Sequence, residues 1–447
     1  MTTTPTVAPE QPDFWKALRF WTKLGFLSFG GPAGQIALMH LELVERRRWI
    51  SERRFLHALN YCMLLPGPEA QQLATYIGWL MHRTWGGIVA GALFVLPSLL
   101  ILIVLSWIYV AFADVPLVAG LFYGIKPAVT AIVLQAAHRI GSRVLKNPVL
   151  WTIAIAAFVA IAVLQLPFPV IVGAAALAGF VGGRFAPDKF RSGASHGKAS
   201  RSFGPALIDD GTPTPAHARF SWNCLARVLL AGMLLWAVPM ALLIAIWGWD
   251  HVFTQMGVFF TKAALLTFGG AYAVLPYVYQ GAVVHYAWLT PAQMIDGLAL
   301  GETTPGPLIM VVAFVGFVGG YQHAAFTGDP LLAATMAAVI VTAFTFLPSF
   351  VFILAGGPLV EATHNDLKFT APLSAITAAV VGVIANLAVF FAYHVFWPAG
   401  TGAPVDWISV LIAIAAATAL LRFKVNVVHV IAACGVVGCL TRFLVQP

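Results

Sequence analysis

Long apolar segments alternate with short polar ones along most of the chain. The longest apolar stretches are 85–113, 116–138, 148–166, 168–183, 224–247, 331–356, 372–394, 407–421 and 427–444. About 20 helical residues cross the ~30 Å hydrocarbon core of a bilayer. The pattern therefore predicts an all-α polytopic membrane protein.

Four apolar pieces near the N-terminus are too short to cross a bilayer alone. Residues 14–28 and 32–44 are separated by Phe29-Gly30-Gly31, and residues 55–65 and 69–81 by Pro66-Gly67-Pro68. Glycine weakens a helix and proline removes a backbone donor. Such a break at membrane depth is tolerated only where it is buried in protein or lines a cavity.

The same breaks occur again in the second half of the chain. Ser28 to Gly31 recurs as Thr267-Phe268-Gly269-Gly270, an offset of 239 residues, and Pro66 to Pro68 recurs as Pro305-Gly306-Pro307 at the same offset. Leu96-Pro97-Ser98 matches Leu347-Pro348-Ser349 at an offset of 251 residues. Paired broken segments in a hydrophobic chain are typical of transporters, whose substrate binds where the broken helices of the two halves meet.

Charge indicates how the halves are oriented. The chain is 60% hydrophobic, 9% charged and has a net charge of +8. Its basic residues gather in short polar segments of the first half, at Arg46, Arg47, Arg48, Arg53, Arg54, Arg83, Arg139, Arg143 and Lys146, whereas the matching loops of the second half have none. This is the positive-inside pattern, not a nucleic-acid footprint, and it predicts an inverted repeat with the basic loops in the cytoplasm.

Two topologies fit the charges. Each broken pair either dips into the membrane and returns to the same side, or spans it as one broken helix, which gives about 13 crossings in all. The first version places the arginines of residues 46–54 in the cytoplasm and is slightly preferred, because every basic loop then obeys the charge rule. Both versions place the N-terminus and the linker in the cytoplasm.

The remaining segments carry less information. The polar stretch 184–223 resembles a disordered linker, and residues 1–13 contain no basic region that would suggest a signal peptide. The four cysteines have no paired CxxC spacing. We interpret them as packing residues and predict no metal site and no cofactor.

A helix that begins after a break points free N–H groups and its positive dipole end toward the cavity, which favours an anion. Four such starts follow Gly31, Pro68, Gly270 and Pro307. The predicted substrate-binding residues are those of the four breaks and their neighbours: Lys23, Phe29, Gly30, Gly31, Pro66, Gly67, Pro68, Gln71, Lys262, Phe268, Gly269, Gly270, Thr304, Pro305, Gly306 and Pro307.

Four charged residues beside the breaks are the sharpest candidates. Lys23 and Lys262 are equivalent in the repeat and lie in apolar helices, where two cationic groups suit a doubly charged oxyanion. The alternative interpretation of each is a lysine that extends to the membrane interface and does not bind substrate. Glu69 and Glu302 lie beside the two Pro-Gly-Pro breaks and are candidates for proton coupling, or else carboxylates that stabilise a helix start.

These motifs resemble a known family. The segments 26–32 (FLSFGGP), 44–51 (VERRRWIS), 65–74 (LPGPEAQQLA) and 90–97 (AGALFVLP), with 266–270 (LTFGG) and 304–307 (TPGP), are similar to the signatures of the chromate ion transporter family in its long two-domain form. The second half departs from the first in having Ala271 in place of Pro32, and Leu308 in place of Glu69. The two half-sites are therefore not expected to be equivalent.

The resemblance implies proton-driven export of chromate, a sulfate analogue, across the bacterial inner membrane, and hence chromate resistance. The implied partners are the oxyanion, protons and the lipid bilayer, with no nucleic acid; a homodimer is a further option. Alternatives are sulfate uptake or an anion channel and, more remotely, a membrane-embedded lipid-modifying enzyme. The expected organisation is a disordered tail at 1–13, a first repeat at 14–184, a cytoplasmic linker at 185–223, an extra helix at 224–247 and a second, inverted repeat at 248–447.

Overall fold

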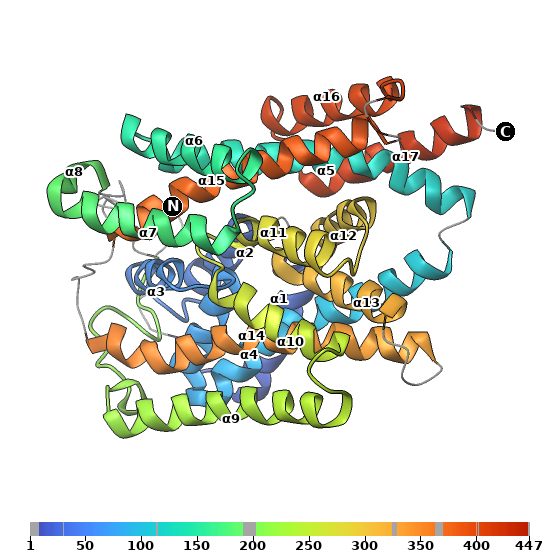
Figure 1. Ribbon diagram of the computed structural model, residues 1–447. Helices are drawn as coiled ribbons and strands as arrows, with labels where there is room; N and C mark the ends of the chain where they lie inside the picture. Colours follow the sequence, from blue (N-terminus) through green and yellow to red (C-terminus); the bar gives the residue numbers. More distant parts are fainter. Residues whose placement is uncertain are drawn as a thin grey trace, which may run out of the picture.

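The structure of the protein is a computed structural model that describes residues 9–29, 31–112, 115–190, 203–323, 329–362, 370–398, 400 and 402–445. Helices make up nearly all of this part of the chain, and the long ones run roughly side by side (Figure 1). The prediction of an all-α architecture is confirmed. The long helices are apolar on most of their surface, so packing against one another and against lipid both suit them.

The first half begins with four short helical pieces and continues with longer helices. Its elements are α1 (Phe14–Leu27), α2 (Gly31–His40), η1 (Leu41–Arg46), α3 (Glu52–Leu64), α4 (Glu69–Ala111), α5 (Pro116–Val144), α6 (Pro148–Ala162) and α7 (Phe168–Phe185). The connection to the second half contains α8 (Pro187–Phe190), η2 (Ala216–Ala218) and α9 (Trp222–Trp247).

The second half follows the same order. Its elements are α10 (Val252–Leu265), α11 (Ala271–Tyr279), η3 (Gln280–His285), α12 (Pro291–Thr303), η4 (Leu308–Met310), α13 (Val311–His323), α14 (Pro330–Ala362), α15 (Thr370–Phe396), α16 (Trp407–Leu421) and α17 (Val427–Val445). Each break predicted from the Gly and Pro motifs separates two of these elements.

Local backbone features also recur at the offset of the sequence repeat. Both η1 and η3 are six-residue π-helices. Each is followed by a residue in the left-handed conformation, Arg48 at φ 52° and Ala287 at φ 51°. The Trp49 amide then donates to the Leu43 carbonyl over 2.8 Å, as the Trp288 amide does to Ala282 over 2.7 Å. The two halves therefore share a fold in detail, although inversion of one half relative to the other stays a prediction.

The helix α4 contains a sharp reversal. The backbone leaves helical geometry at His82 and at Arg83, where φ is 57°. Gly78 and Gly86 then pack so closely that a Cβ atom on Gly78 would lie 2.5 Å from the Gly86 carbonyl oxygen. The segment 69–81 thus folds back along the start of the long apolar segment that follows, which agrees with the boundary predicted near residue 81.

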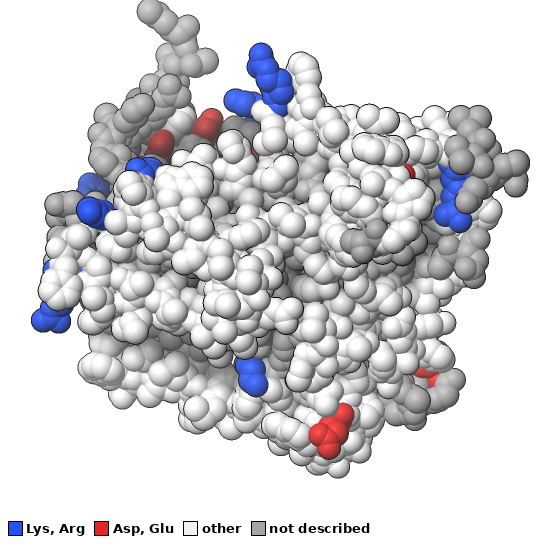
Figure 2. All heavy atoms as spheres, turned by 45° about the horizontal axis from the view of Figure 1, so that its top comes forward, with Lys and Arg blue, Asp and Glu red and all other residues white. Residues whose placement is uncertain are grey.

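Six helices in the described part of the chain are long and apolar enough to cross a membrane: Glu69–Ala111, Pro116–Val144, Phe168–Phe185, Trp222–Trp247, Pro330–Glu361 and Ala371–Phe396. Five shorter apolar helices accompany them. The face in Figure 2 is mostly uncharged, with most of its lysines and arginines toward the edges. These features are those of a multi-pass membrane protein.

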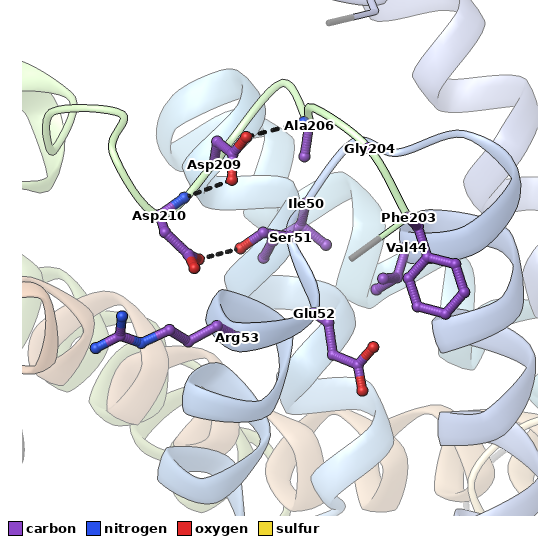
Figure 3. A pocket seen from close by; sticks show the side chains of 10 residues that line it. All are labelled: Val44, Ile50, Ser51, Glu52, Arg53, Phe203, Gly204, Ala206, Asp209 and Asp210. Atoms are coloured by element: carbon purple, nitrogen blue, oxygen red, sulfur yellow. Dashed lines mark hydrogen bonds between the residues drawn. The ribbon is translucent and has the colours of Figure 1, made fainter. Parts of the chain in front are cut away.

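The expectation of a disordered linker is wrong for residues 203–221. The Leu207 and Ile208 amides donate to the carbonyls of Arg48 and Trp49, and the Ser51 hydroxyl donates to Asp210 over 2.6 Å (Figure 3). His217 donates to the Trp79 carbonyl over 2.9 Å, and burial lowers the pKa of its imidazole. This segment is therefore docked on the Arg-rich turn of the first half.

The N-terminal tail is also shorter than expected. Gln11 donates to the Met81 carbonyl over 3.0 Å, and His82 donates to the Pro12 carbonyl over 2.9 Å. Residues 9–13 therefore have a defined place beside the reversal in α4, whereas residues 1–8 lie outside the described part of the chain.

Two hydrogen bonds bear on the membrane topology. Ser51 bonds to Asp210 of the linker, and Gln280 accepts a bond from the Phe168 amide in the α6–α7 turn over 3.2 Å. If each broken pair crossed the membrane, an odd number of crossings would separate the partners in both contacts. Because partners in a hydrogen bond cannot lie on opposite sides of a bilayer, the contacts favour pairs that return to the side of entry.

This topology predicts which side of the membrane reaches three engineered cysteines. In a protein whose four cysteines are replaced by alanine, Glu45→Cys and Gly211→Cys should react with an impermeant maleimide from one side, and Val284→Cys from the other. Glu45 and Val284 are repeat equivalents with exposed side chains, and a Cβ at Gly211 meets no atom within 4 Å. Labelling of Glu45→Cys and Gly211→Cys from opposite sides would restore the 13-crossing topology.

Candidate functional site

The four breaks meet in two reciprocal contacts between the halves. The Gly67 amide donates to the carbonyl of Thr267 over 2.8 Å, and the Gly306 amide donates to the carbonyl of Ser28 over 2.8 Å. Each Pro-Gly-Pro break therefore bonds to the Phe-Gly-Gly break of the other half. We call the Ser28–Gly306 contact crossing A and the Thr267–Gly67 contact crossing B.

Glycine is required at the centre of both crossings. Gly67 has φ +131° and Gly306 has φ +105°, a backbone conformation that residues with a Cβ rarely adopt. A Cβ on Gly306 would also lie 2.7 Å from Cβ of Ser98, and one on Gly67 would collide with the hydroxyl of Ser349. The third repeated motif, Pro97-Ser98 and Pro348-Ser349, thus packs on the breaks of the opposite half.

Crossing A is polar but uncharged. The Gln35 amide group donates to the carbonyls of Gly306 (2.5 Å) and Ser28 (3.2 Å). The Gln35 Oε1 atom and the Ser98 hydroxyl are fully buried and have no hydrogen-bond partner. A buried polar atom without a partner is costly, so this crossing has unused capacity for a ligand or water.

Crossing B carries the two predicted proton-coupling carboxylates. The Glu69 carboxylate lies beside Gly270 at the start of α11, with Oε1 3.6 Å from the position of a Cβ on that glycine. The buried Glu302 accepts a hydrogen bond from Tyr272 in the first turn of the same helix. Both acidic groups, although distant in sequence, therefore converge on one helix start.

Two arginines of α5 lie in the wider surroundings of this acidic pair. Arg139 interacts electrostatically with both Glu69 and Glu302, and Arg143 with Glu69. We expected these arginines in a loop, but both lie inside α5 (Pro116–Val144), which continues past the predicted end at residue 138. Crossing B is therefore an acidic pair with basic residues at a longer distance than an ion pair.

Other polar residues near the breaks make local bonds. The fully buried Gln71 donates to the Thr75 hydroxyl over 3.1 Å, and Gln72 donates to the Pro66 carbonyl over 2.8 Å. Their Oε1 atoms are buried without partners. Thr304 donates to the Gly301 carbonyl over 3.2 Å and so caps its own helix.

The remaining predicted residues are placed less centrally. Lys23 and Lys262 have exposed side chains, and neither makes a hydrogen bond or ion pair in the described part of the structure. Phe29 is also exposed, at 40%, and Phe268 is half-buried. Gly30 lies outside the described residues, whereas Pro66, Gly31 and Gly269 lie at the breaks as expected.

Sequence reasoning missed a charge pair whose carboxylate is buried. Lys126 of α5 lies 3.3 Å from Asp296 of α12, and Tyr109 of α4 donates to the same carboxylate oxygen over 2.9 Å. The other oxygen, Oδ1, is buried without a hydrogen-bond partner. The signal was available, since a lysine inside an apolar segment marks a functional candidate.

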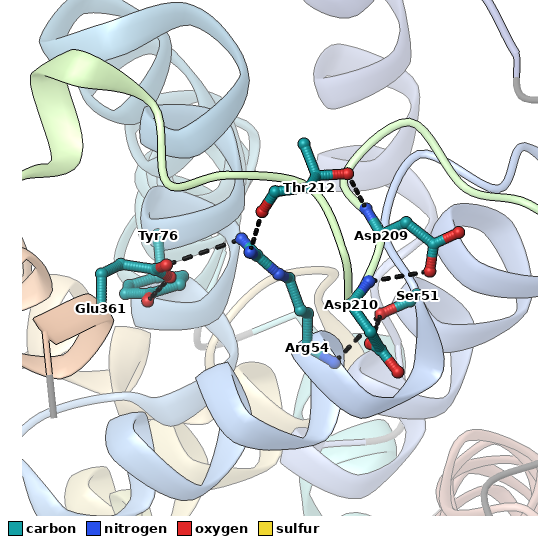
Figure 4. Close-up of polar contacts among 7 residues, drawn as sticks. All are labelled: Ser51, Arg54, Tyr76, Asp209, Asp210, Thr212 and Glu361. Atoms are coloured by element: carbon teal, nitrogen blue, oxygen red, sulfur yellow. Dashed lines mark hydrogen bonds and ion pairs between the residues drawn. The ribbon is translucent and has the colours of Figure 1, made fainter. Parts of the chain in front are cut away.

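A second ion pair lies at the docked linker (Figure 4). Arg54 of α3 lies 3.5 Å from Glu361 of α14 and donates to the Thr212 carbonyl over 2.6 Å. Tyr76 of α4 donates to Glu361 over 2.5 Å. The nearby surface pocket of Figure 3 has lining side chains of both charges, Glu52, Arg53, Asp209 and Asp210, and so has no clear preference for an anion.

The described residues contain no group of three or more His, Cys, Asp or Glu side chains placed to hold a metal ion.

Comparison with known proteins gives the family. The family described as "Chromate transporter" matches residues 15–180 and 254–439, one match in each half. A chromate transport protein of Pseudomonas aeruginosa is 33% identical over 98% of this chain and 94% of its own length. A chromate transport protein of Cupriavidus metallidurans is 29% identical over 91% of this chain and 87% of its own.

An uncharacterized transporter of Methanocaldococcus jannaschii is 23% identical over 84% of this chain and 83% of its own length. No solved structure matches the chain. The chain belongs to the chromate transporter family, as the motifs predicted, and it is a membrane transport protein rather than a lipid-modifying enzyme.

The crossings predict a specific cost for an added methyl group. Gly306→Ala should lower stability by about 1–3 kcal/mol, because it strains the backbone and meets Ser98. Adding Ser98→Gly should recover only part of the loss, since the φ strain remains. Thermal unfolding in detergent measures both, with Gly173→Ala as control because its Cβ meets no atom within 4 Å. An unchanged melting temperature for Gly306→Ala would show that crossing A does not constrain the fold.

Proposed function

We propose that this member of the chromate transporter family is a secondary transporter that exports chromate, a tetrahedral dianion, from the cytoplasm using the proton-motive force. The observation that carries the proposal is the reciprocal contact between the breaks, which brings helix starts of both halves together. Its relatives of similar length are named chromate transport proteins. Export of this kind would confer chromate resistance.

Crossing A is the better place for the oxyanion. The start of α2 after Gly31 and the backbone after Gly306 supply N–H groups there, and neither is followed by a carboxylate, since Leu308 stands where the first half has Glu69. The Ser98 hydroxyl, which is buried without a partner, can donate a hydrogen bond to the oxyanion, whereas the free Oε1 atom of Gln35 can only accept one. In a dry site such groups replace the hydration shell of an anion.

Crossing B is the better place for the proton. Glu69 and Glu302 lie at the start of α11, where an ionised carboxylate would occupy the position an oxyanion needs. Repulsion between a bound dianion and ionised carboxylates links the two crossings, and on its own it would favour binding of the dianion and the proton together. Proton-driven export therefore also requires that the halves change conformation with either the dianion or the proton bound, but not with both. Divergence of the two repeats thereby separates substrate binding from proton binding.

The direction of transport follows from the membrane potential. With the cytoplasm negative, outward movement of a dianion is favoured by about 4–5 kcal/mol per 100 mV. We place the N-terminus and the docked linker in the cytoplasm of a bacterial inner membrane, because the basic turn at residues 46–54 contacts this linker.

Inverted membrane vesicles test this function. With an imposed proton gradient, the parent protein should accumulate labelled chromate inside the vesicles. Excess sulfate should compete with chromate for this uptake. Equal flux with the gradient collapsed would indicate a channel, and accumulation of sulfate in right-side-out vesicles without chromate export would indicate sulfate uptake.

The carboxylates should control the response to pH in the same vesicles. Glu69→Gln or Glu302→Gln should abolish accumulation driven by a pH gradient alone, because the neutral amide cannot carry a proton. Both variants should retain chromate exchange at equal pH. A variant that keeps normal pH-driven accumulation would clear that carboxylate of the role.

Binding measurements separate Ser98 from the two lysines. Ser98→Ala, Lys23→Met and Lys262→Met should each weaken chromate binding by about one to two powers of ten, since a hydrogen bond to a charged group contributes roughly 1.5–3 kcal/mol. Arginine at either lysine position should rescue only partly. If both methionine variants bind like the parent while Ser98→Ala does not, the exposed lysines are interfacial and the site rests on crossing A.

A further inference from the structure

Two ion pairs join the halves outside the crossings, and they are built alike. In each, the cation belongs to the first half and the carboxylate to the second: Lys126 with Asp296, and Arg54 with Glu361. In each, a tyrosine of α4 donates to the same carboxylate, Tyr109 to Asp296 and Tyr76 to Glu361.

The two pairs lie far apart along α4. Tyr76 packs beside Gly87 and Gly91 of the segment after the reversal, because a Cβ on either glycine would contact the neighbouring Thr75. Tyr109 lies about 20 residues further along this segment, which at 1.5 Å per residue is roughly 30 Å. Arg54 contacts the docked linker, while Lys126 is close in sequence to Tyr123, which donates to Asp406 in the loop before α16.

The repeat relates the two positions. Arg54 and Asp296 lie on the equivalent helices α3 and α12, and Glu361 and Tyr109 lie at the equivalent ends of α14 and α4. The residue equivalent to Asp296 is His57, and the one equivalent to Tyr109 is Val360. Each half therefore meets the other at the same place in the fold, with different side chains at the two ends.

Neither pair is tightly satisfied. The Lys126–Asp296 distance of 3.3 Å and the Arg54–Glu361 distance of 3.5 Å are long for charge-assisted hydrogen bonds. Asp296 Oδ1 and Arg54 Nη1 are buried without hydrogen-bond partners. A pair with a buried carboxylate adds little net stability, but its separation is costly unless another partner takes the place of the lost one.

We propose that these pairs are the two gates of the transport path, with Arg54–Glu361 closing the linker end and Lys126–Asp296 the opposite end. When a gate opens, the carboxylate withdraws with the second half and the cation stays with the first half, where it can pair with the oxyanion instead. Both pairs are formed in the structure, which is therefore closed at both ends. The inference rests on the proposed function only in taking the crossings as the path.

Side-specific labelling tests the gates without chromate. The reporter is Ser98→Cys at crossing A in a protein whose native cysteines are replaced by alanine, and the probe is an impermeant anionic thiosulfonate added from either side. Lys126→Met with Asp296→Asn removes one pair without leaving an unpaired charge, and Arg54→Met with Glu361→Gln removes the other. The first should speed labelling about tenfold from the side opposite the linker, and the second about tenfold from the linker side.

Matched variants complete the test. Arg53→Met and Asp250→Asn, which change exposed charges near each end, should leave labelling unchanged. Lys126→Arg, which keeps the cation, should also label as the parent does. Unchanged labelling after removal of either pair, or an equal increase from both sides, in proteins that remain monodisperse would overturn the gates. If side-specific labelling appears but the parent protein, with Ser98 intact, does not transport chromate, the gates stand and the proposed function fails.

Discussion

The structure depends on two backbone hydrogen bonds, from Gly67 to Thr267 and from Gly306 to Ser28. Each joins a backbone N–H of a broken segment in one half to a carbonyl of a broken segment in the other, at a place where the helix does not continue and cannot supply the partner. An unpaired backbone group in hydrocarbon costs several kcal/mol. The breaks are therefore stable only in pairs, which ties the two halves together at their centre.

This constraint explains which features of the halves are alike. The glycines at the crossings, the π-helices and the left-handed residues recur at an offset of 239 residues, and the serines that pack against the glycines recur at an offset of 251. These positions form the backbone frame of the crossings. The side chains that line the frame differ: Gln35 faces crossing A where the second half has Val274, and Glu69 faces crossing B where the second half has Leu308.

Because the side chains that line the two crossings differ, the same backbone frame has two chemical roles. Crossing A has neutral polar groups with free capacity, whereas crossing B gathers two carboxylates. The polar contacts between the halves follow the same principle, because Lys126–Asp296 and Arg54–Glu361 occupy related places with unrelated side chains. A duplicated chain can thus bind unlike ions and close at two ends without changing its fold.

The sequence by itself determined the helical membrane class, the breaks, the repeat and the family, because these depend on local composition and on the order of motifs. Helix boundaries such as 14–27 and 407–421 follow from the apolar pattern and the glycines and prolines that end it. Only the tertiary structure decided what the breaks touch, because partners such as Gly67 and Thr267, or Lys126 and Asp296, are far apart in the chain and no periodicity links them. It also decided that residues 203–221 are ordered, since this polar segment is held by hydrogen bonds to the Arg48–Arg54 turn rather than by a pattern of its own.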